Sequence, residues 1–295
     1  MGIAIPPSVR HLISQGQVLW PLTSMRVGGA ARWLAEPNTV SDLITIFSWI
    51  REQRLPYVVL GGGSNILFGE GGYPGVVIST RQLKGIRVNG TSVVVAAGER
   101  LSELAMKLNR GGLSGLEWAC GIPGTVGGAV VMNAGTRDGD MASVLENVRV
   151  LTASGVRQWP VEDFKLGYRT SSLRTGCLEG IVLEVALKLH QDDPAQCVER
   201  ERSILKLRQE TQPLGASSGC IFKNPEGGPP AGLLLDRAGC KGLRVGTVAV
   251  SNLHANFIVN EGAQNAADVF ALIDKMKARV LEMAGTELQL EVVRY

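Results

Sequence analysis

The sequence predicts an α+β protein, and the order of its expected elements supports this class in three ways. The chain starts with a β–α–β pattern up to about residue 79, as in a small α/β unit. Residues 80–190 then contain mostly short strands, and residues 194–293 mix helices with strands. Because 295 residues exceed the usual size of one domain, the length predicts two or three domains. We expect three, at residues 1–79, 80–210 and 211–295.

The first domain is expected to contain one helix between two buried strands. Residues 41–53 predict the helix, because their apolar residues share one face. Thr39 and Asp42 can cap its first turn. Apolar residues 56–60 and 75–78 predict the strands.

The second domain is expected to consist mainly of short strands, at residues 85–89, 92–97, 148–151, 156–160 and 180–189. One helix, at residues 101–110, interrupts them and ends at Gly111 and Gly112, as a C-terminal glycine stop predicts. A polar helix follows at residues 194–210, with Pro194 in its first turn and charges that predict a solvated face.

The third domain is predicted to have helices at residues 230–238 and 266–284 and strands at residues 245–250, 256–260 and 288–293. The last helix is expected to turn one apolar face inward, formed by Val269, Ile273, Met276, Val280 and Met283.

Composition excludes several classes of function. The net charge of +3, with 19% charged residues of both signs, gives no basic footprint for nucleic acid and no polybasic membrane patch. Five cysteines without C-x-x-C spacing predict reduced thiols and a cytoplasmic location. Three dispersed histidines predict no metal site. We also expect no signal peptide and no membrane span.

Two glycine-rich stretches are candidates for holding a phosphate or a flat ring. Residues 61–65 follow a predicted strand, but Ile66 breaks the dinucleotide fingerprint, and the Gly-Lys-Ser/Thr of a P-loop is missing. Backbone N–H groups in such a loop can still bind pyrophosphate. Residues 121–135 form an uncharged wall of small residues that suits an apolar ring. A tight turn without a ligand remains the alternative for each stretch.

Residues 217–225 are a third candidate, because two serines and a glycine lead into Cys220, followed by Lys223 and Asn224. Small residues allow the backbone to approach a ligand closely, and a cation with an amide can hold an anionic or hydroxylated one. A turn with an inert, buried thiol is the alternative reading.

Together these stretches resemble the UDP-N-acetylenolpyruvoylglucosamine reductase family, flavoenzymes also called UDP-N-acetylmuramate dehydrogenases. The resemblance runs from residue 23 to residue 292 and rests on a combination of motifs. These are Leu-Gly-Gly-Gly-Ser-Asn at 60–65, Gly-Ile-Pro-Gly-Thr-Val-Gly-Gly-Ala at 121–129, Tyr-Arg-Thr-Ser at 168–171, Gly-Cys-Ile-Phe-Lys-Asn-Pro at 219–225, His-Ala-Asn-Phe at 254–257 and Leu-Glu-Val at 290–292.

The resemblance implies a two-subdomain FAD-binding scaffold of the vanillyl-alcohol-oxidase (PCMH) type, followed by a C-terminal α+β substrate-binding domain, in the compact subtype of the family. FAD is expected to bind without a covalent bond, and NADPH to reduce it. The cofactor-binding residues implied are Gly61, Gly62, Gly63, Ser64, Asn65, Gly121, Ile122, Pro123, Gly124, Thr125, Gly127, Gly128 and Ala129.

The implied reaction reduces UDP-N-acetyl-enolpyruvoylglucosamine to UDP-N-acetylmuramate for peptidoglycan, and so for cell-wall growth, cell shape and division. Reduced flavin adds hydride to the vinyl carbon, and negative charge develops beside the carboxylate. The resemblance assigns catalysis to Arg169, Cys220 and Glu291, and substrate binding to Lys223, Asn224 and His254.

These roles suit the chemistry of the three catalytic side chains. Arg169 can fork onto a carboxylate, and Glu291 has to be protonated to donate a hydrogen bond there. Cys220 stands where the family has serine, and an ordinary thiol, with a pKa of about 8.5, is a stronger acid than an alcohol. Taken singly, each of the three residues also fits an ordinary structural role.

Two other functions stay open from the sequence. One is a different FAD oxidoreductase on the same scaffold, such as a sugar or lactone oxidase. The other is a non-catalytic protein that binds a UDP-sugar. We expect a monomer that acts on a small molecule and not on nucleic acid or membrane.

Overall fold

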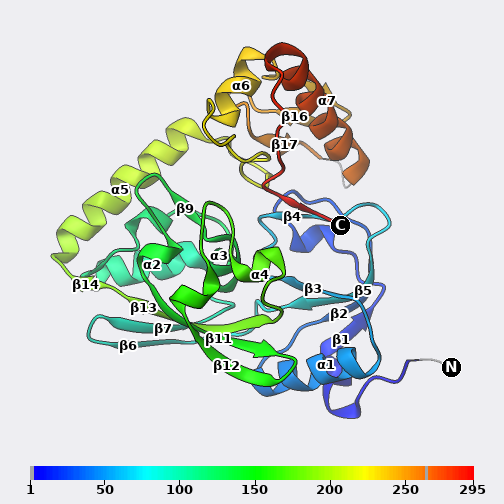
Figure 1. Ribbon diagram of the computed structural model, residues 1–295, viewed down its shortest axis with the longest axis vertical. Helices are drawn as coiled ribbons and strands as arrows, with labels where there is room; N and C mark the ends of the chain where they lie inside the picture. The colour runs from blue at the N-terminus through cyan, green and yellow to red at the C-terminus, as the bar shows by residue number, and fades with distance from the viewer. Residues whose placement is uncertain (1–2, 263–264) are drawn as a thin grey trace. The chain divides into compact units, whose positions relative to one another are not determined.

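The computed structural model describes residues 3–262 and 265–295, and they form two compact units (Figure 1). No helix in these ranges is long and apolar enough to cross a membrane. The predicted boundaries at residues 79/80 and 210/211 stay a prediction. Unit 1 comprises Met1–Ser14, Trp33–Gly62 and Gly75–Leu207, and unit 2 comprises Gln15–Arg32, Gly63–Pro74 and Arg208–Tyr295.

The first sheet has the strand order β1-β2-β5-β3. Edge strand β3 pairs in parallel with β5, with Leu60 of β3 opposite Ser79 of β5. Helix α1 (Val40–Glu52) begins at the predicted capping box, in which Thr39 N donates to Asp42 Oδ2 (2.9 Å) and Asp42 N donates to Thr39 Oγ1 (3.1 Å). The helix and the two strands predicted here are confirmed, the strands as β3 (Tyr57–Leu60) and β5 (Tyr73–Ser79). The sheet also contains β1 (Ile13–Gln15) and β2 (Ala31–Ala35).

The second sheet is antiparallel throughout and has the order β12-β11-β13-β7-β6. Helices α2 (Leu101–Arg110) and α3 (Val126–Met132) share its apolar core. The five predicted strands are confirmed as β6 (Ile86–Asn89), β7 (Ser92–Ala96), β11 (Leu145–Thr152), β12 (Gly155–Pro160) and β13 (Ile181–Lys188).

Helix α3 lies inside the glycine-rich stretch for which the sequence predicted only a wall of small residues. Thr125 caps it, with its Oγ1 accepting from Gly128 N at 3.5 Å. A Cβ on Gly127 would lie 2.8 Å from the Cβ of Ala97, so this glycine allows the helix to pack closely. Tertiary packing therefore outweighs the low helix propensity of glycine here.

Helix α5 (Pro194–Thr211) confirms the predicted polar helix, but its face is not uniformly solvated. Glu201 is only 5% exposed and accepts from Asn109 Nδ2 at 3.2 Å. Arg200 Nη2 donates to Glu117 Oε1 at 2.8 Å and contacts Asp192 Oδ2 at 2.5 Å. Charge pattern alone does not reveal Glu117 and Asn109 as partners, because they lie 83 and 92 positions away in the sequence.

Unit 2 contains an antiparallel sheet of order β15-β16-β17, with helices α6 and α7 packed on it (Figure 1). Four of the five residues predicted to face inward on α7 are buried, which confirms that face, but Met283 is 46% exposed. The elements are α6 (Ala231–Arg237), β15 (Arg244–Val245), β16 (Val248–Val250), β17 (Ile258–Asn260) and α7 (Ala266–Ala284).

The strand predicted at residues 288–293 is mostly absent. Strand β18 covers only Val293–Arg294 and pairs in parallel with β4 (Ile66–Leu67), while Leu290 forms a single bridge with Phe222. Shorter elements complete the fold: η1 (Pro7–Leu12), η2 (Trp20–Leu22), β8 (Leu113–Ser114), η3 (Glu117–Ala119), β9 (Gly135–Thr136), β10 (Gly139–Asp140), η4 (Met141–Ser143), η5 (Val161–Phe164), α4 (Ser172–Thr175) and β14 (His190–Gln191).

The buried Glu117 carboxylate offers a test of what holds α5. Burial alone would raise the pKa of Glu117, but hydrogen bonds from Ser114, Gly115 and Arg200 outweigh the effect of burial. The net result is a lowered pKa. We expect Glu117→Gln to reduce the free energy of unfolding by about 1–3 kcal/mol at neutral pH, because these donors lose a charged acceptor. Chemical denaturation measures this loss.

The same experiment has a pH signature. The contribution of Glu117 is present above an ordinary glutamate pKa of about 4.3 and is lost as the pH falls through the lowered pKa of the folded state. The difference between wild type and Glu117→Gln should therefore shrink at low pH. Glu199→Gln is the control, because that side chain is 71% exposed. Equal stability of both variants would contradict the assignment.

Candidate active site

The two glycine loops of unit 1 touch each other through their backbones. Strand β3 ends at Leu60, and a Cβ on Gly61 would lie 2.4 Å from Thr125 Oγ1. A Cβ on Gly62 would lie 2.4 Å from the Cα of Gly124. Only glycine permits this approach, since real Cβ atoms do not come within 3.0 Å of such neighbours.

Arg81 fixes the orientation of the first loop. Its Nε donates to Gly61 O at 2.9 Å and its Nη2 donates to Gly62 O at 3.0 Å. Within residues 3–262 and 265–295, no acceptor takes a hydrogen bond from the N–H groups of Gly61 and Gly62. The loop therefore keeps two adjacent amide donors for an anion, which fits a pyrophosphate.

Arg81 was missed by the sequence analysis, although a signal for it exists. It follows β5, which pairs in parallel with β3 so that Leu60 lies opposite Ser79. Parallel strands end at the same edge of a sheet, so a residue just after β5 must lie near the loop after β3. Burial lowers the pKa of the Arg81 guanidinium.

The second loop is anchored before α3 begins. Gly121 N donates to Ser102 Oγ at 2.7 Å, and Leu101 N donates to Gly124 O at 3.1 Å. These bonds tie the loop to the start of α2. Of the other predicted flavin residues here, Ile122 is half-buried, Pro123 and Gly128 are exposed, and Thr125, Gly127 and Ala129 are buried.

Arg169 lies in a turn that the far end of α3 holds in place. Gly167 and Thr170 exchange two backbone hydrogen bonds of 3.2 Å around it, and Ser171 Oγ donates to Val131 O at 2.6 Å. Arg169 itself has φ +53°, a left-handed conformation that is unfavourable for residues with a side chain. Helix α3 thus supports the glycine loop at its start and the Arg169 turn at its end.

In unit 2, the segment containing Cys220 is hydrogen-bonded along both edges. On one side Ile221 N donates to Asn256 O (2.9 Å), and Cys220 bridges Phe257. On the other side Glu291 N donates to Ile221 O at 2.8 Å. The structure therefore brings Cys220 and Glu291 to neighbouring positions of one small backbone network.

Asn256 was also missed by the sequence analysis. It is 2% exposed, its Oδ1 accepts from Phe222 N at 2.9 Å, and its Nδ2 donates to Phe222 O at 2.8 Å. This side chain holds both backbone groups of Phe222, so it fixes the segment just after Cys220. The resemblance covered Asn256 as part of a motif, but only the fold shows its partner.

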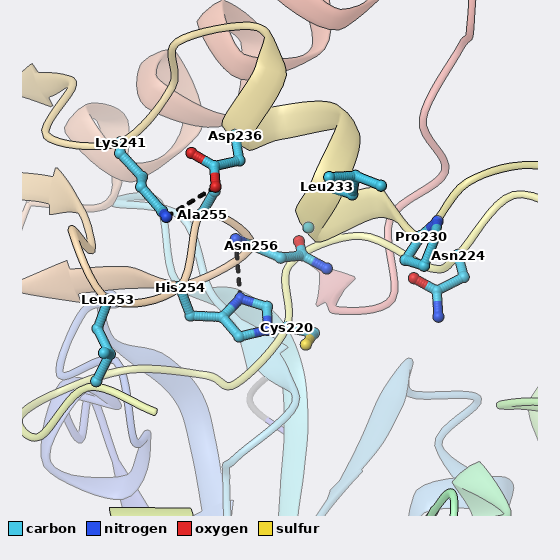
Figure 2. A pocket seen from close by; sticks show the side chains of 11 residues that line it. Cys220, Asn224, Pro230, Leu233, Asp236, Lys241, Leu253, His254, Ala255 and Asn256 are labelled. Carbon is cyan, nitrogen blue, oxygen red and sulfur yellow. Dashed lines mark hydrogen bonds and ion pairs between the residues drawn. The ribbon is translucent and has the colours of Figure 1, made fainter. Parts of the chain in front are cut away.

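A pocket of about 360 Å³ opens beside Cys220 (Figure 2). Figure 2 shows the thiol and the His254 ring near each other in this pocket. Lys241 Nζ and Asp236 Oδ2 form an ion pair of 2.8 Å in its wall. Cys220, Asn224 and His254 are the predicted site residues that line it.

Several predicted residues of unit 2 also hold the backbone in place. Lys223 N donates to Gln289 O at 2.9 Å, and Asn224 Oδ1 accepts from Ala231 N at 3.0 Å, which holds the first turn of α6. Gly63 has φ +69°, and a Cβ there would lie 2.0 Å from Leu22 O. Asn65 Nδ2 donates to Glu291 O at 3.2 Å.

The position of His254 defines its tautomer. Its Nδ1 accepts from Asn256 N at 3.2 Å, so the proton of the neutral ring belongs on Nε2. Gly232 leaves room for the ring, since a Cβ there would lie 3.0 Å from His254 Cε1. Burial, followed by the charge of Lys241, lowers the pKa of His254.

No metal centre competes with these groups among the residues that the structure describes. Nowhere in residues 3–262 and 265–295 do three or more His, Cys, Asp or Glu side chains lie where they could hold an ion together.

We expect the titration midpoint of His254 to lie below the ordinary histidine pKa of about 6.5. Above that midpoint, the neutral ring should carry its proton on Nε2. Long-range ¹H–¹⁵N correlation spectra of protein labelled at its three histidines measure this. Lys241→Met should move the midpoint upward, because it removes a repelling charge. Lys188→Met, on strand β13, is the control. A wild-type midpoint at or above 6.5 would contradict the assignment.

Comparison with known protein families matches both parts of the chain. Residues 31–159 match the family model described as an FAD binding domain. Residues 209–295 match the model of the UDP-N-acetylenolpyruvoylglucosamine reductase C-terminal domain. The predicted α+β class, with an FAD-binding part before a C-terminal domain, is confirmed by these matches.

Curated relatives and a solved structure agree over nearly the full length. The reductase of Synechococcus elongatus is 40% identical over 289 residues, which is 97% of this chain and 95% of the relative. The reductase of Chloroflexus aurantiacus is 40% identical over 277 residues, or 92% and 93% of the two chains. The crystal structure of the enzyme from Thermus caldophilus superimposes with a TM-score of 0.82 at 40% identity, covering 95% of this chain and 97% of that one. The chain therefore belongs to the UDP-N-acetylenolpyruvoylglucosamine reductase family.

Proposed function

We propose that this protein uses FAD and NADPH to reduce UDP-N-acetylenolpyruvoylglucosamine to UDP-N-acetylmuramate, a step of peptidoglycan precursor synthesis. The observation that carries the proposal is the 40% identity to reductases over 97% of this chain. The order of an FAD binding domain and a reductase C-terminal domain supports the same function.

The glycine loops of unit 1 suit the dinucleotide. The N–H groups of Gly61 and Gly62, whose carbonyl groups Arg81 holds, would bind the pyrophosphate, with Ser64 and Asn65 farther along the loop. The small residues before α3 would line the ring system. When bound, FAD supplies the hydride that it receives from NADPH. The absence of a histidine tether in the glycine loops fits non-covalent binding.

Three side chains would then handle the charge and the proton. Arg169 would fork onto the substrate carboxylate, where negative charge develops as the vinyl group is reduced. Cys220 would give its S–H proton to the carbon that bears this carboxylate, leaving a thiolate that water reprotonates. A protonated Glu291 would donate a hydrogen bond to the same developing charge.

The pocket beside Cys220 suits the remainder of the substrate. It contains the amide of Asn224 and the Nε2–H of His254, both of which can donate to oxygen atoms of a nucleotide sugar. Lys223, two residues before Pro225, adds a cation to the same segment. We assign substrate binding to these three residues.

The two other functions considered are less well supported. The relatives from Synechococcus elongatus and Chloroflexus aurantiacus and the structure from Thermus caldophilus, each 40% identical to this chain, are reductases, which speaks against a sugar or lactone oxidase. The presence of Arg169, Cys220 and Glu291 together speaks against a non-catalytic UDP-sugar-binding protein. We extend the proposal to a monomer that is located in the cytoplasm, and the five free cysteines support the location.

Gly62 tests the cofactor part of this proposal. We expect Gly62→Ala to weaken FAD binding at least about tenfold, because the new methyl group collides with Gly124 and separates the loops. Flavin absorbance of the purified protein and titration with FAD measure the change. Gly71→Ala is the control, since Gly71 is exposed with nothing within 4 Å of its Cβ position. Normal flavin content in Gly62→Ala would contradict the proposed site.

Cys220 tests the chemical step. In Cys220→Ala we expect NADPH to bleach the flavin nearly as in wild type, while reoxidation by the enolpyruvyl UDP-sugar falls about 10²-fold or more, because the proton donor is lost. Stopped-flow absorbance separates the two half-reactions. Cys220→Ser should restore much of the second half-reaction, since a hydroxyl can also deliver a proton. Normal reoxidation in Cys220→Ala would exclude this residue as the donor.

A further inference from the structure

Glu291 has both of its backbone groups fixed by residues that belong to the proposed site. Its N–H donates to Ile221 O at 2.8 Å, next to Cys220. Its carbonyl oxygen accepts from Asn65 Nδ2 at 3.2 Å. These two bonds fix the peptide groups on either side of the Glu291 Cα, and so the direction in which its side chain leaves the backbone.

The orientation of the Asn65 side chain is determined by its partner. A backbone carbonyl only accepts hydrogen bonds, so Asn65 must present its NH₂ group and not its carbonyl oxygen to Glu291. The backbone of Asn65 is used as well, because Val293 N donates to Asn65 O at 2.9 Å. Asn65 thus contacts this segment twice, at residues 291 and 293.

The neighbouring residues make the connection stiff. Val293 and Arg294 pair in parallel with Ile66 and Leu67, and Tyr295 N donates to Leu67 O at 2.9 Å. The ring of Tyr295 stacks on Phe68 at 5.7 Å between centroids. Segment 289–295 is therefore a rigid connection. One end contacts the Cys220 segment, and the other end contacts the end of the proposed flavin loop.

We propose that Asn65 is a positioning residue for Glu291, so that binding of FAD to the loop containing Ser64 and Asn65 orders the segment that presents the Glu291 carboxyl group. The inference rests on the proposed function, because it takes residues 61–65 to hold the pyrophosphate. Ligand and carboxyl group are then coupled through one short chain of hydrogen bonds.

Val293 allows the coupling to be broken outside the catalytic and binding residues. Val293→Pro removes the N–H that donates to Asn65 O, whereas Val293→Ala keeps it and shortens the same half-buried side chain. The difference between the two variants therefore reports the hydrogen bond and not the lost packing. We expect Val293→Pro to bind FAD about three- to tenfold more weakly than Val293→Ala.

Hydrogen exchange followed by mass spectrometry provides a direct readout in the full-length protein. FAD should slow amide exchange in peptides covering 289–295 and 220–223 of wild type and Val293→Ala, and should slow it much less in Val293→Pro. At saturating FAD, Val293→Pro should reduce flavin reoxidation by the enolpyruvyl UDP-sugar at least about fivefold more than flavin reduction by NADPH. A role limited to stability would lower both rates together.

The outcomes separate this inference from the function on which it rests. If wild type binds no FAD, or if the enolpyruvyl UDP-sugar does not reoxidise its flavin, the proposed function fails. If wild type does both and Val293→Pro behaves as Val293→Ala, only the positioning role is overturned.

Asn65→Ala replaces Val293→Pro if the proline variant does not fold. It keeps the backbone ladder but removes the amide that holds Glu291 O. At saturating FAD it should lose the exchange response of residues 289–291 and show the same imbalance between half-reactions. An unchanged response and ratio would overturn the proposal.

Discussion

The two-sided pairing of the short segment after Gly219 is the constraint on which the candidate site of unit 2 depends. Asn256 and its neighbours bond one edge of this segment, and residues 289–291 bond the other. A single segment in the middle of such a ladder has little freedom, so the Cys220 thiol is presented to its pocket from a fixed backbone. The pocket is then built from the turn that contains His254 and from the start of α6, which Asn224 holds.

Helix α3 has a comparable role in unit 1. Its first turn packs closely enough on Ala97 to require glycine, and the residues before it approach the loop after β3. Its last turn receives a hydrogen bond from Ser171, which follows Arg169. This seven-residue helix thus contacts the glycine loops at its start and the Arg169 turn at its end. A displacement of the helix would therefore move both.

The regular elements were predictable because their signals are local. The capping box of Thr39 and Asp42, the glycine stop after residue 110 and the inward face of α7 each follow from a few adjacent residues. Helix α3 was not predictable, because its glycines lower the local helix propensity, and the packing against Ala97 that compensates for them is not visible in the sequence. Arg81 and Asn256 were not singled out either, since their importance lies in bonds to residues about 20 and 34 positions away. Met283 was predicted to face inward and does not, because it lies in the last turn of α7, beyond Val280, the last residue of that face that is buried.

The backbone at Arg169 has a consequence for how this turn can change over generations. Its φ of +53° costs about 1–2 kcal/mol for most residues with a Cβ, and glycine would relieve that cost. Selection for thermal stability therefore favours glycine at position 169, whereas selection for a guanidinium group that binds a carboxylate favours arginine. Laboratory evolution toward heat resistance alone should drift to glycine here, and the substitution would act as a marker of lost selection for the chemistry.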